Sequence, residues 1–111
     1  MNINLKNYKV RLNMPRPRRF RRISNKPDIN YFKPAGVPIR RLEENKISLV
    51  ELEAIRLKDC LELDQKDCAK KMEISQPTFH RLIIDARKKI ADALVNGKAI
   101  KLEGGNYKFS D

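Results

Sequence analysis

Two stretches of the sequence carry side chains that suit contacts to nucleic acid. The first spans residues 75–88 (SQPTFHRLIIDARK). Gln76 suits adenine and Arg81 suits guanine, because each presents two hydrogen-bonding atoms to a base edge, whereas the basic run at 87–89 suits phosphates. His80 suits either a base or a phosphate. The duplex contacts predicted in this stretch are Ser75, Gln76, Pro77, Thr78, His80, Arg81 and Lys88.

The second stretch is the arginine cluster at residues 15–22 (PRPRRFRR), which also contains two prolines. Proline removes backbone donors and like charges repel, so we expect this arm to be extended and solvated when free. Its arginines would follow a phosphate backbone or enter a minor groove. The alternative is a basic tail that binds any polyanion. The arginines concerned are Arg16, Arg18, Arg19, Arg21 and Arg22.

Charge is divided unevenly along the chain. The formal net charge is +11 over 111 residues. Residues 1–46 carry 13 Lys/Arg against 3 Asp/Glu, whereas residues 47–111 carry 12 against 11. This division favours a polyanionic partner and predicts a basic arm attached to a nearly neutral folded module.

Catalytic or metal chemistry has little support in the sequence. Cys60, Cys68 and His80 are the only soft candidates, and their spacing matches no standard zinc pattern. We expect both cysteines to lie in the core and His80 to face outward. No nucleophile–base set can be named, so we predict neither an enzyme nor a bound cofactor or metal. With no apolar run of about 20 residues and no secretory signal, we expect a cytoplasmic protein without a membrane span.

Three helices are predicted to position the first stretch. Ser48 and Glu51 have the spacing of a capping box, and that helix should continue to about Cys60. Asp64 begins a second helix that runs to about residue 72. Ser75 begins a third, which can run to about residue 96, where Gly97 is a natural end.

The second and third of these helices have the residue pattern of a helix-turn-helix over residues 65–84. Cys68 and Met72 share one face, Ala69 is small where two helices would approach, and Ile74 fills the corner under the turn. The turn often carries glycine where this chain has Glu73, which would cost roughly 1 kcal/mol at a positive φ.

A helical wheel assigns the faces of the third helix. With Phe79 inward, the apolar side chains at 82, 83, 86 and 90 cluster near it, while Arg81, Ile84 and Lys88 point away. In such a motif the outward face of this helix enters the major groove. The far half, with apolar residues at 90 and 93–95, needs a cover, which would be a second copy of the chain, the first helix or the loop at 27–38.

The rest of the chain is predicted as flanking structure. Residues 1–13 are an extension or a weak strand, and translation from Met1 or Met14 stays open. Residues 14–46 form the arm and a proline-rich loop, in which Tyr31 and Phe32 should pin the loop to the helical domain at 47–97. In the tail at 98–111, the glycine pair at 104–105 between two apolar pairs is a β-hairpin signal, although such pairs also occur in flexible tails.

Several blocks of sequence, in order, resemble one prokaryotic family. They are MPRPRRFRRI, YFKPAGVPIRRLEE, LVELEAIRL, ISQPTFHRLIIDARKKIADALVNGKAI and EGGNY. The family is the domain of unknown function 134, also called uncharacterised protein family 0251. The resemblance implies a DNA-binding protein with a helix-turn-helix similar to region 4 of sigma-70-type factors. Its members often have cysteine near the arginine cluster, where this chain has Phe20.

The sequence therefore predicts a mainly α protein: a three-helix, region-4-like helix-turn-helix with a basic N-terminal arm and a short C-terminal hairpin. Its predicted partner is double-stranded DNA and its predicted role is transcriptional regulation. The alternatives are an RNA-binding protein or a module that contacts RNA polymerase, since a basic arm suits RNA as well as DNA and region-4-like domains also contact polymerase. A homodimer would cover the far half of the third helix.

Overall fold

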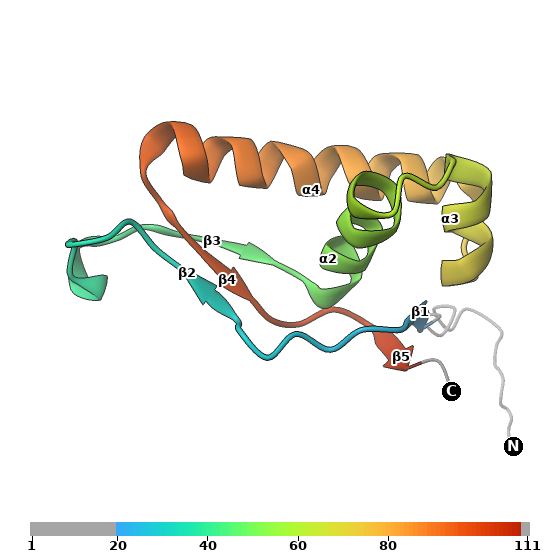
Figure 1. Cartoon of the computed structure of the whole chain (residues 1–111), viewed down its shortest axis with the longest axis horizontal. Coiled ribbons are helices and arrows are strands. Elements are labelled where there is room, and N and C mark those ends of the chain that lie inside the picture. Colours follow the sequence, from blue (N-terminus) through green and yellow to red (C-terminus); the bar gives the residue numbers. More distant parts are fainter. Residues whose placement is uncertain (1–19, 110–111) are drawn as a thin grey trace, which may run out of the picture.

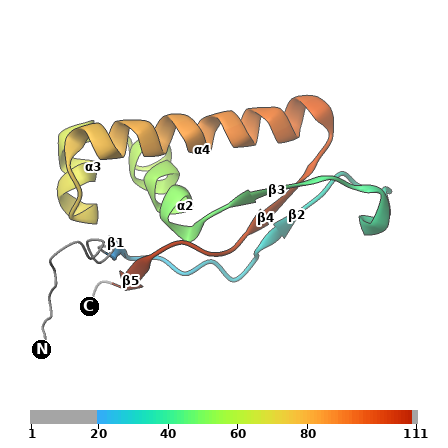
Figure 2. The same cartoon turned by 180° about the vertical axis from the view of Figure 1, so that it is seen from behind.

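The computed structural model describes residues 20–109, in which helix is the main secondary structure. The predicted helices all form, and α4 runs along the long axis of the molecule (Figures 1 and 2). The helices are α2 (Leu49–Ile55), which continues as a π-helical turn η2 (Arg56–Cys60), α3 (Gln65–Met72) and α4 (Gln76–Asn96). None of these described helices is both long and apolar enough to cross a membrane.

Each helix begins at its predicted cap. Ser48 and Glu51 form the reciprocal capping box of α2. The Asp64 carboxylate accepts a hydrogen bond from the Asp67 N–H at 2.8 Å, and the Ser75 hydroxyl accepts from the N–H of Thr78. These side chains satisfy backbone donors that a helix start otherwise leaves free.

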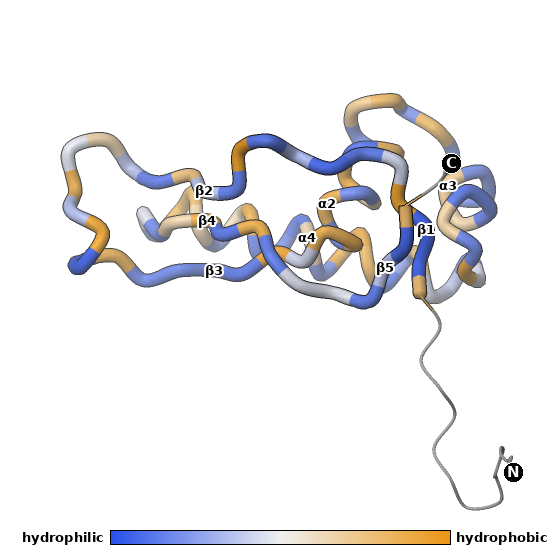
Figure 3. The backbone as a smooth tube through the Cα atoms, turned by 90° about the horizontal axis from the view of Figure 1, so that it is seen from below, coloured by the Kyte–Doolittle hydropathy of each residue, from blue (hydrophilic) through white to orange (hydrophobic). Residues whose placement is uncertain are grey.

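Within residues 20–109, five short strands form two small sheets. The strands are β1 (Arg21–Ile23), β2 (Tyr31–Phe32), β3 (Glu44–Ile47), β4 (Ala99–Leu102) and β5 (Tyr107–Phe109). Strand β4 lies between β2, antiparallel to it, and β3, parallel to it, while β1 and β5 form a separate parallel pair. Seen from below, β2 and β3 flank β4 (Figure 3), and a 3₁₀ turn, η1 (Ile39–Arg41), lies between β2 and β3 in the chain.

The two strands of the predicted C-terminal hairpin are confirmed, but the prediction that they pair with each other is wrong. Strands β4 and β5 lie on either side of the glycine pair, but they pair with other strands and not with each other. The connection instead packs on the start of α2: Leu49 N–H donates to the Gly104 carbonyl at 3.0 Å. A Cβ on Gly105 would lie 3.1 Å from Ser48 Cβ, which is a tight contact, and the φ of Gly105 is +100°, a conformation that favours glycine.

The core lies where α2, α3 and α4 meet. It contains Val50, Ala54, Leu57, Cys68, Ala69, Met72, Phe79 and Ile83. Strand β1 adds Ile23, which is fully buried. Phe79, Ile83 and Ala86 confirm the predicted inward face of α4, and exposed Ile84 confirms the outward one.

Three predictions about apolar residues need correction or remain open. Tyr31 and Phe32 build β2 instead of pinning the loop to the helices; Phe32 is 53% exposed. Cys60 is exposed, because the π-helical turn ends there at the surface, whereas Cys68 is buried as predicted. Leu94 and Val95 are 76% and 81% exposed, so no described part of the chain covers them and the dimer stays a prediction.

Candidate nucleic-acid interface

A three-residue connection (73–75) joins α3 to α4, and its first residue has a left-handed backbone. Glu73 has φ 59° and ψ 44°, and its N–H donates to the carbonyls at the end of α3. Ile74 N–H donates to the Ala69 carbonyl at 3.0 Å, which closes the turn. The positive φ predicted at this position is confirmed. In both views of the ribbon, α3 stands at a steep angle to α4 (Figures 1 and 2).

Ser75 and Thr78 are engaged with each other at the start of α4. The Ser75 hydroxyl donates to Thr78 Oγ1 at 2.8 Å and accepts from the Thr78 N–H at 3.3 Å. Pro77 lies in the first turn, where its missing donor costs nothing. These residues of the predicted interface therefore stabilise the start of α4. The hydroxyl groups of Ser75 and Thr78 are already engaged in a hydrogen bond with each other.

Four of the predicted contacts lie together beside the α3–α4 turn. A shallow, open hollow is lined by Gln65, Gln76, Pro77, His80 and Arg81. Gln65 Nε2 lies 3.2 Å from His80 Nδ1, so α3 and α4 are linked at this surface. Gln76 and Arg81 are exposed, and within residues 20–109 the Arg81 side chain has no hydrogen-bond or ion-pair partner. Sequence reasoning missed Gln65, whose only signal was its place directly after the cap of α3.

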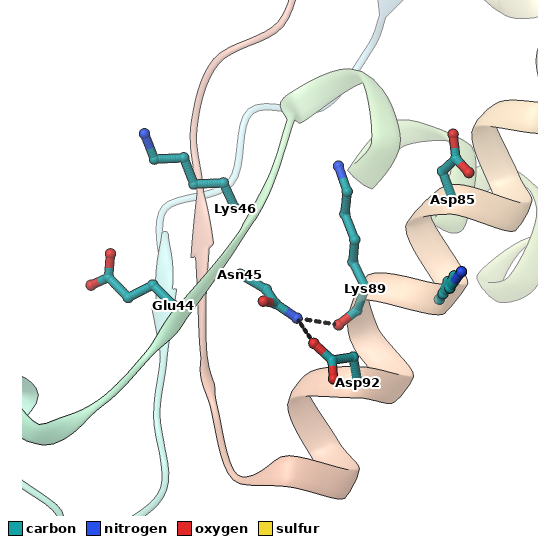
Figure 4. A pocket seen from close by; sticks show the side chains of 7 residues that line it. Glu44, Asn45, Lys46, Asp85, Lys89 and Asp92 are labelled. Atoms are coloured by element: carbon teal, nitrogen blue, oxygen red, sulfur yellow. Dashed lines mark hydrogen bonds between the residues drawn. The ribbon is translucent and has the colours of Figure 1, made fainter.

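Lys88 lies two turns beyond Arg81, on the same face of α4 and about 10 Å away along its axis. A second hollow lies between α4 and β3 (Figure 4). Lys88 is one of the residues that line it, and no ion pair engages Lys88 within the described chain. Its basic neighbours are already paired: Arg87 with Asp59, and Lys89 with Glu51 at 2.8 Å. Lys88 is therefore better placed for a phosphate than either neighbour in the predicted 87–89 run.

Strand β1 holds the described end of the arginine cluster on the fold. Arg16, Arg18 and Arg19 lie outside the described residues. The prediction placed Arg21 and Arg22 in a solvated arm. In the structure they lie in β1 instead, paired in register with Tyr107 and Lys108. The physical reason is the burial of Ile23 and the backbone pairing with β5, which compensate for leaving water.

A buried carboxylate fixes the end of β1 to α2. Glu53, 4% exposed, accepts hydrogen bonds from Ser24 N–H at 3.0 Å and Ser24 Oγ at 2.9 Å, and from Arg56 Nε at 2.9 Å. Burial raises the pKa of the Glu53 carboxyl, but the hydrogen bonds from Arg56 and Ser24 outweigh burial, so the net pKa is lowered. Sequence reasoning missed this connection, because Glu53 looked like an ordinary exposed residue of a helix.

Further cations lie on α3. Lys66, Lys70 and Lys71 are exposed, and no ion pair engages them within residues 20–109. Lys66 and Lys70 are four residues apart and share one face. Arg81 and Lys88 on α4 are likewise exposed cations without an ion pair in the described chain, and the same two helices also carry the exposed carboxylates Asp67 and Asp85.

Side chains that could bind a metal ion do not gather anywhere in the described part of the chain. No group of three or more His, Cys, Asp or Glu side chains there lies close enough to hold a metal ion. Burial raises the pKa of the Cys68 thiol, which therefore stays protonated near neutral pH.

The structure thus defines a small, mainly helical protein with a cationic surface around one interhelical turn. A family model described as "Protein of unknown function DUF134" matches residues 11–110. The chain belongs to this family. The resemblance noted in the sequence is confirmed.

The curated relatives carry names of the same uncharacterised family. A UPF0251 protein of Caldanaerobacter subterraneus subsp. tengcongensis is 58% identical over 95 residues, which cover 86% of this chain and 80% of the relative. A UPF0251 protein of Syntrophomonas wolfei is 56% identical, over 85% of this chain and 72% of the relative. One of Dehalococcoides mccartyi is 55% identical, over 86% and 82%. No solved structure matches this chain.

Proposed function

We propose that this protein binds double-stranded DNA in a sequence-specific manner and acts as a transcriptional regulator. In this proposal α3, the 73–75 turn and α4 are a helix-turn-helix, and the first turns of α4 enter the major groove. The observation that carries it is the exposed set Gln76, His80 and Arg81 on the first turns of a helix that follows a tight left-handed turn.

The dimensions of the groove limit which residues can read bases. A major groove is about 12 Å wide and 8.5 Å deep, whereas α4 is roughly 30 Å long at 1.5 Å per residue. Only its first turns can therefore reach base edges. Gln76 and Arg81 would read bases, and Lys88 would contact phosphate farther out.

The first helix of such a motif crosses the sugar–phosphate backbone. Lys66 and Lys70 on α3 would then bind phosphates. These contacts position the protein without reading sequence, so the affinity they add should depend strongly on salt.

The test is selection of bound sequences from a random duplex pool with the full chain. We expect an enriched motif. On the selected duplex, Arg81→Ala should weaken binding by about 1–3 kcal/mol and relax specificity at one position. Arg40→Ala is the matched control, because Arg40 is also exposed but lies on η1, before β3.

Three results would argue against the proposal. The pool yields no motif, Arg81→Ala weakens all sequences equally, or structured RNA competes better than duplex DNA at the same salt concentration. The last result would favour the RNA-binding alternative, since the cationic surface by itself suits either polymer.

A further inference from the structure

Two cations face each other across the β1–β5 pair. Arg22 and Lys108 are direct partners in the parallel register, so their side chains leave the ribbon on the same face. Like charges at directly opposed positions destabilise a strand pair. Glu73, from the α3–α4 turn, lies between them, with Arg22 Nε 2.6 Å and Lys108 Nζ 3.6 Å from its carboxylate oxygens. One carboxylate therefore balances two cations.

The donors of this pair are poorly used. Within residues 20–109 neither Arg22 nor Lys108 makes a side-chain hydrogen bond, and Arg22 Nε is buried without an acceptor in hydrogen-bonding geometry. The Glu73 carboxylate is close enough to Arg22 for a charge interaction but is badly aligned for a hydrogen bond. Its distance from Lys108, 3.6 Å, is too long for a hydrogen bond. Arginine offers five N–H donors and lysine three. An anion with several oxygens would satisfy them better.

The Arg22–Lys108 pair lies next to the first turn of α4, which is proposed to read bases. Glu73 is three residues before Gln76, so their Cα atoms are at most about 11 Å apart. That is less than the width of a major groove, about 12 Å, and phosphates line both walls of the groove. A duplex read by Gln76 would therefore bring its backbone near Glu73.

We propose that Arg22 and Lys108 form a binding site for a backbone phosphate of duplex DNA, and that Glu73 is its internal competitor. In the free protein Glu73 neutralises the pair and holds the ribbon against the turn. On binding, a phosphate replaces the carboxylate as the partner of both cations. This inference rests on the proposed function, because it needs a duplex at the α3–α4 turn.

Competition predicts opposite signs for stability and binding. Glu73→Gln should destabilise the fold, because it leaves two cations unbalanced, and yet tighten DNA binding. A purely structural ion pair would make Glu73→Gln lose both. Glu62→Gln is the matched control: Glu62 has the same φ of 59°, is also exposed, and has no ion pair within the described residues.

The experiment measures binding of the full chain to a labelled random-sequence duplex by fluorescence anisotropy over a range of salt concentrations. Arg22→Gln and Lys108→Gln should each lower the magnitude of the salt slope by about 0.9 and weaken binding up to about eightfold at 0.1 M salt. Glu73→Gln should tighten binding about fivefold, the effect of one unit charge about 4 Å away in water. Glu62→Gln should change it less than twofold.

Two outcomes would overturn the site. One is an unchanged salt slope of duplex binding for both Arg22→Gln and Lys108→Gln. The other is an equal change in duplex affinity for Glu73→Gln and Glu62→Gln. If these appear while the unaltered chain binds duplex and Arg81→Ala weakens that binding on a selected sequence, the phosphate site fails and the proposed function stands. If the unaltered chain does not bind duplex, both fail. Urea unfolding of each variant shows that it is folded under the binding conditions.

Discussion

Two glutamates with the same strained backbone provide a test of the ion pairs at the turn. Glu62 and Glu73 both have φ 59°, a conformation that disfavours side chains with a Cβ. Glu73 contacts Arg22 and Lys108, whereas Glu62 has no ion pair in the described part of the chain. Substituting glycine at each position therefore relieves the same strain, but only Glu73→Gly removes charge contacts.

The expected magnitudes follow from this difference. A left-handed backbone costs a residue with a Cβ about 1–2 kcal/mol, and substituting glycine removes this cost. Glycine also makes the unfolded chain more flexible, which lowers the free energy of unfolding by roughly 0.5–1 kcal/mol. Glu62→Gly should therefore raise the free energy of unfolding by about 0.5–1 kcal/mol. Two half-exposed ion pairs are worth about 0.2–1 kcal/mol each, so Glu73→Gly should be close to neutral at low salt.

Salt separates the two contributions. Urea unfolding followed by circular dichroism is measured at about 0.01 M and about 1 M salt, where the Debye length falls from about 30 Å to 3 Å. Glu62→Gly should gain the same stability at both concentrations, whereas Glu73→Gly should gain it only at high salt. If Glu73→Gly already matches Glu62→Gly at low salt, the ion pairs with Arg22 and Lys108 contribute nothing and our reasoning about the turn is wrong.

Three further predictions test the packing. In the native protein a thiol reagent should modify exposed Cys60 rapidly and buried Cys68 only after unfolding; rapid reaction of both would contradict the core. Hydrogen bonds from Lys98, Asn45 and Asn96 together lower the pKa of Asp92 from 3.8 to about 2. The stabilising contribution of the Asp92 carboxylate should therefore be complete above pH 3.8 and disappear as the pH falls through 2, and NMR titration of this carboxyl should show the low pKa. Ile23→Ala should cost about 2–5 kcal/mol in urea unfolding, and a loss below about 1 kcal/mol would mean that β1 is not docked.

The helices could be predicted because their signals are local. A cap such as Ser48, Asp64 or Ser75 acts on backbone groups within three residues, and the inward face of α4 follows from a fixed helical period. The positive φ at Glu73 was predictable for the same reason, since it depends on the shape of a short turn.

The strands and their partners could not be predicted in the same way. The composition of the arginine cluster favours solvation, and nothing near Arg21 indicates that β5, at the other end of the chain, will pair with it. The ion pair of Glu73 with Arg22 depends on that pairing. Glu73, whose positive φ makes the turn costly, therefore forms ion pairs with residues that are distant in the sequence, Arg22 and Lys108.

The three-stranded sheet explains how a helix as long as α4 is supported. Its first half packs on α2 and α3, but its second half extends beyond them (Figure 1). There Asn45 of β3 donates from Nδ2 to the Lys89 carbonyl and to Asp92 Oδ2, each at 2.9 Å (Figure 4).

This support extends the packing of α4 to Lys89 and Asp92, and a helix held in this way loses less entropy when its first turns bind a partner. The same packing limits where a second copy could dock. Ala93 faces inward and is buried, whereas Leu94 and Val95 are turned away by about 100° and 200° and stay exposed. A homodimer would therefore have to cover these two side chains. Light scattering at high concentration should show a dimer that Leu94→Lys dissociates, and a monomer of the unaltered chain would exclude it.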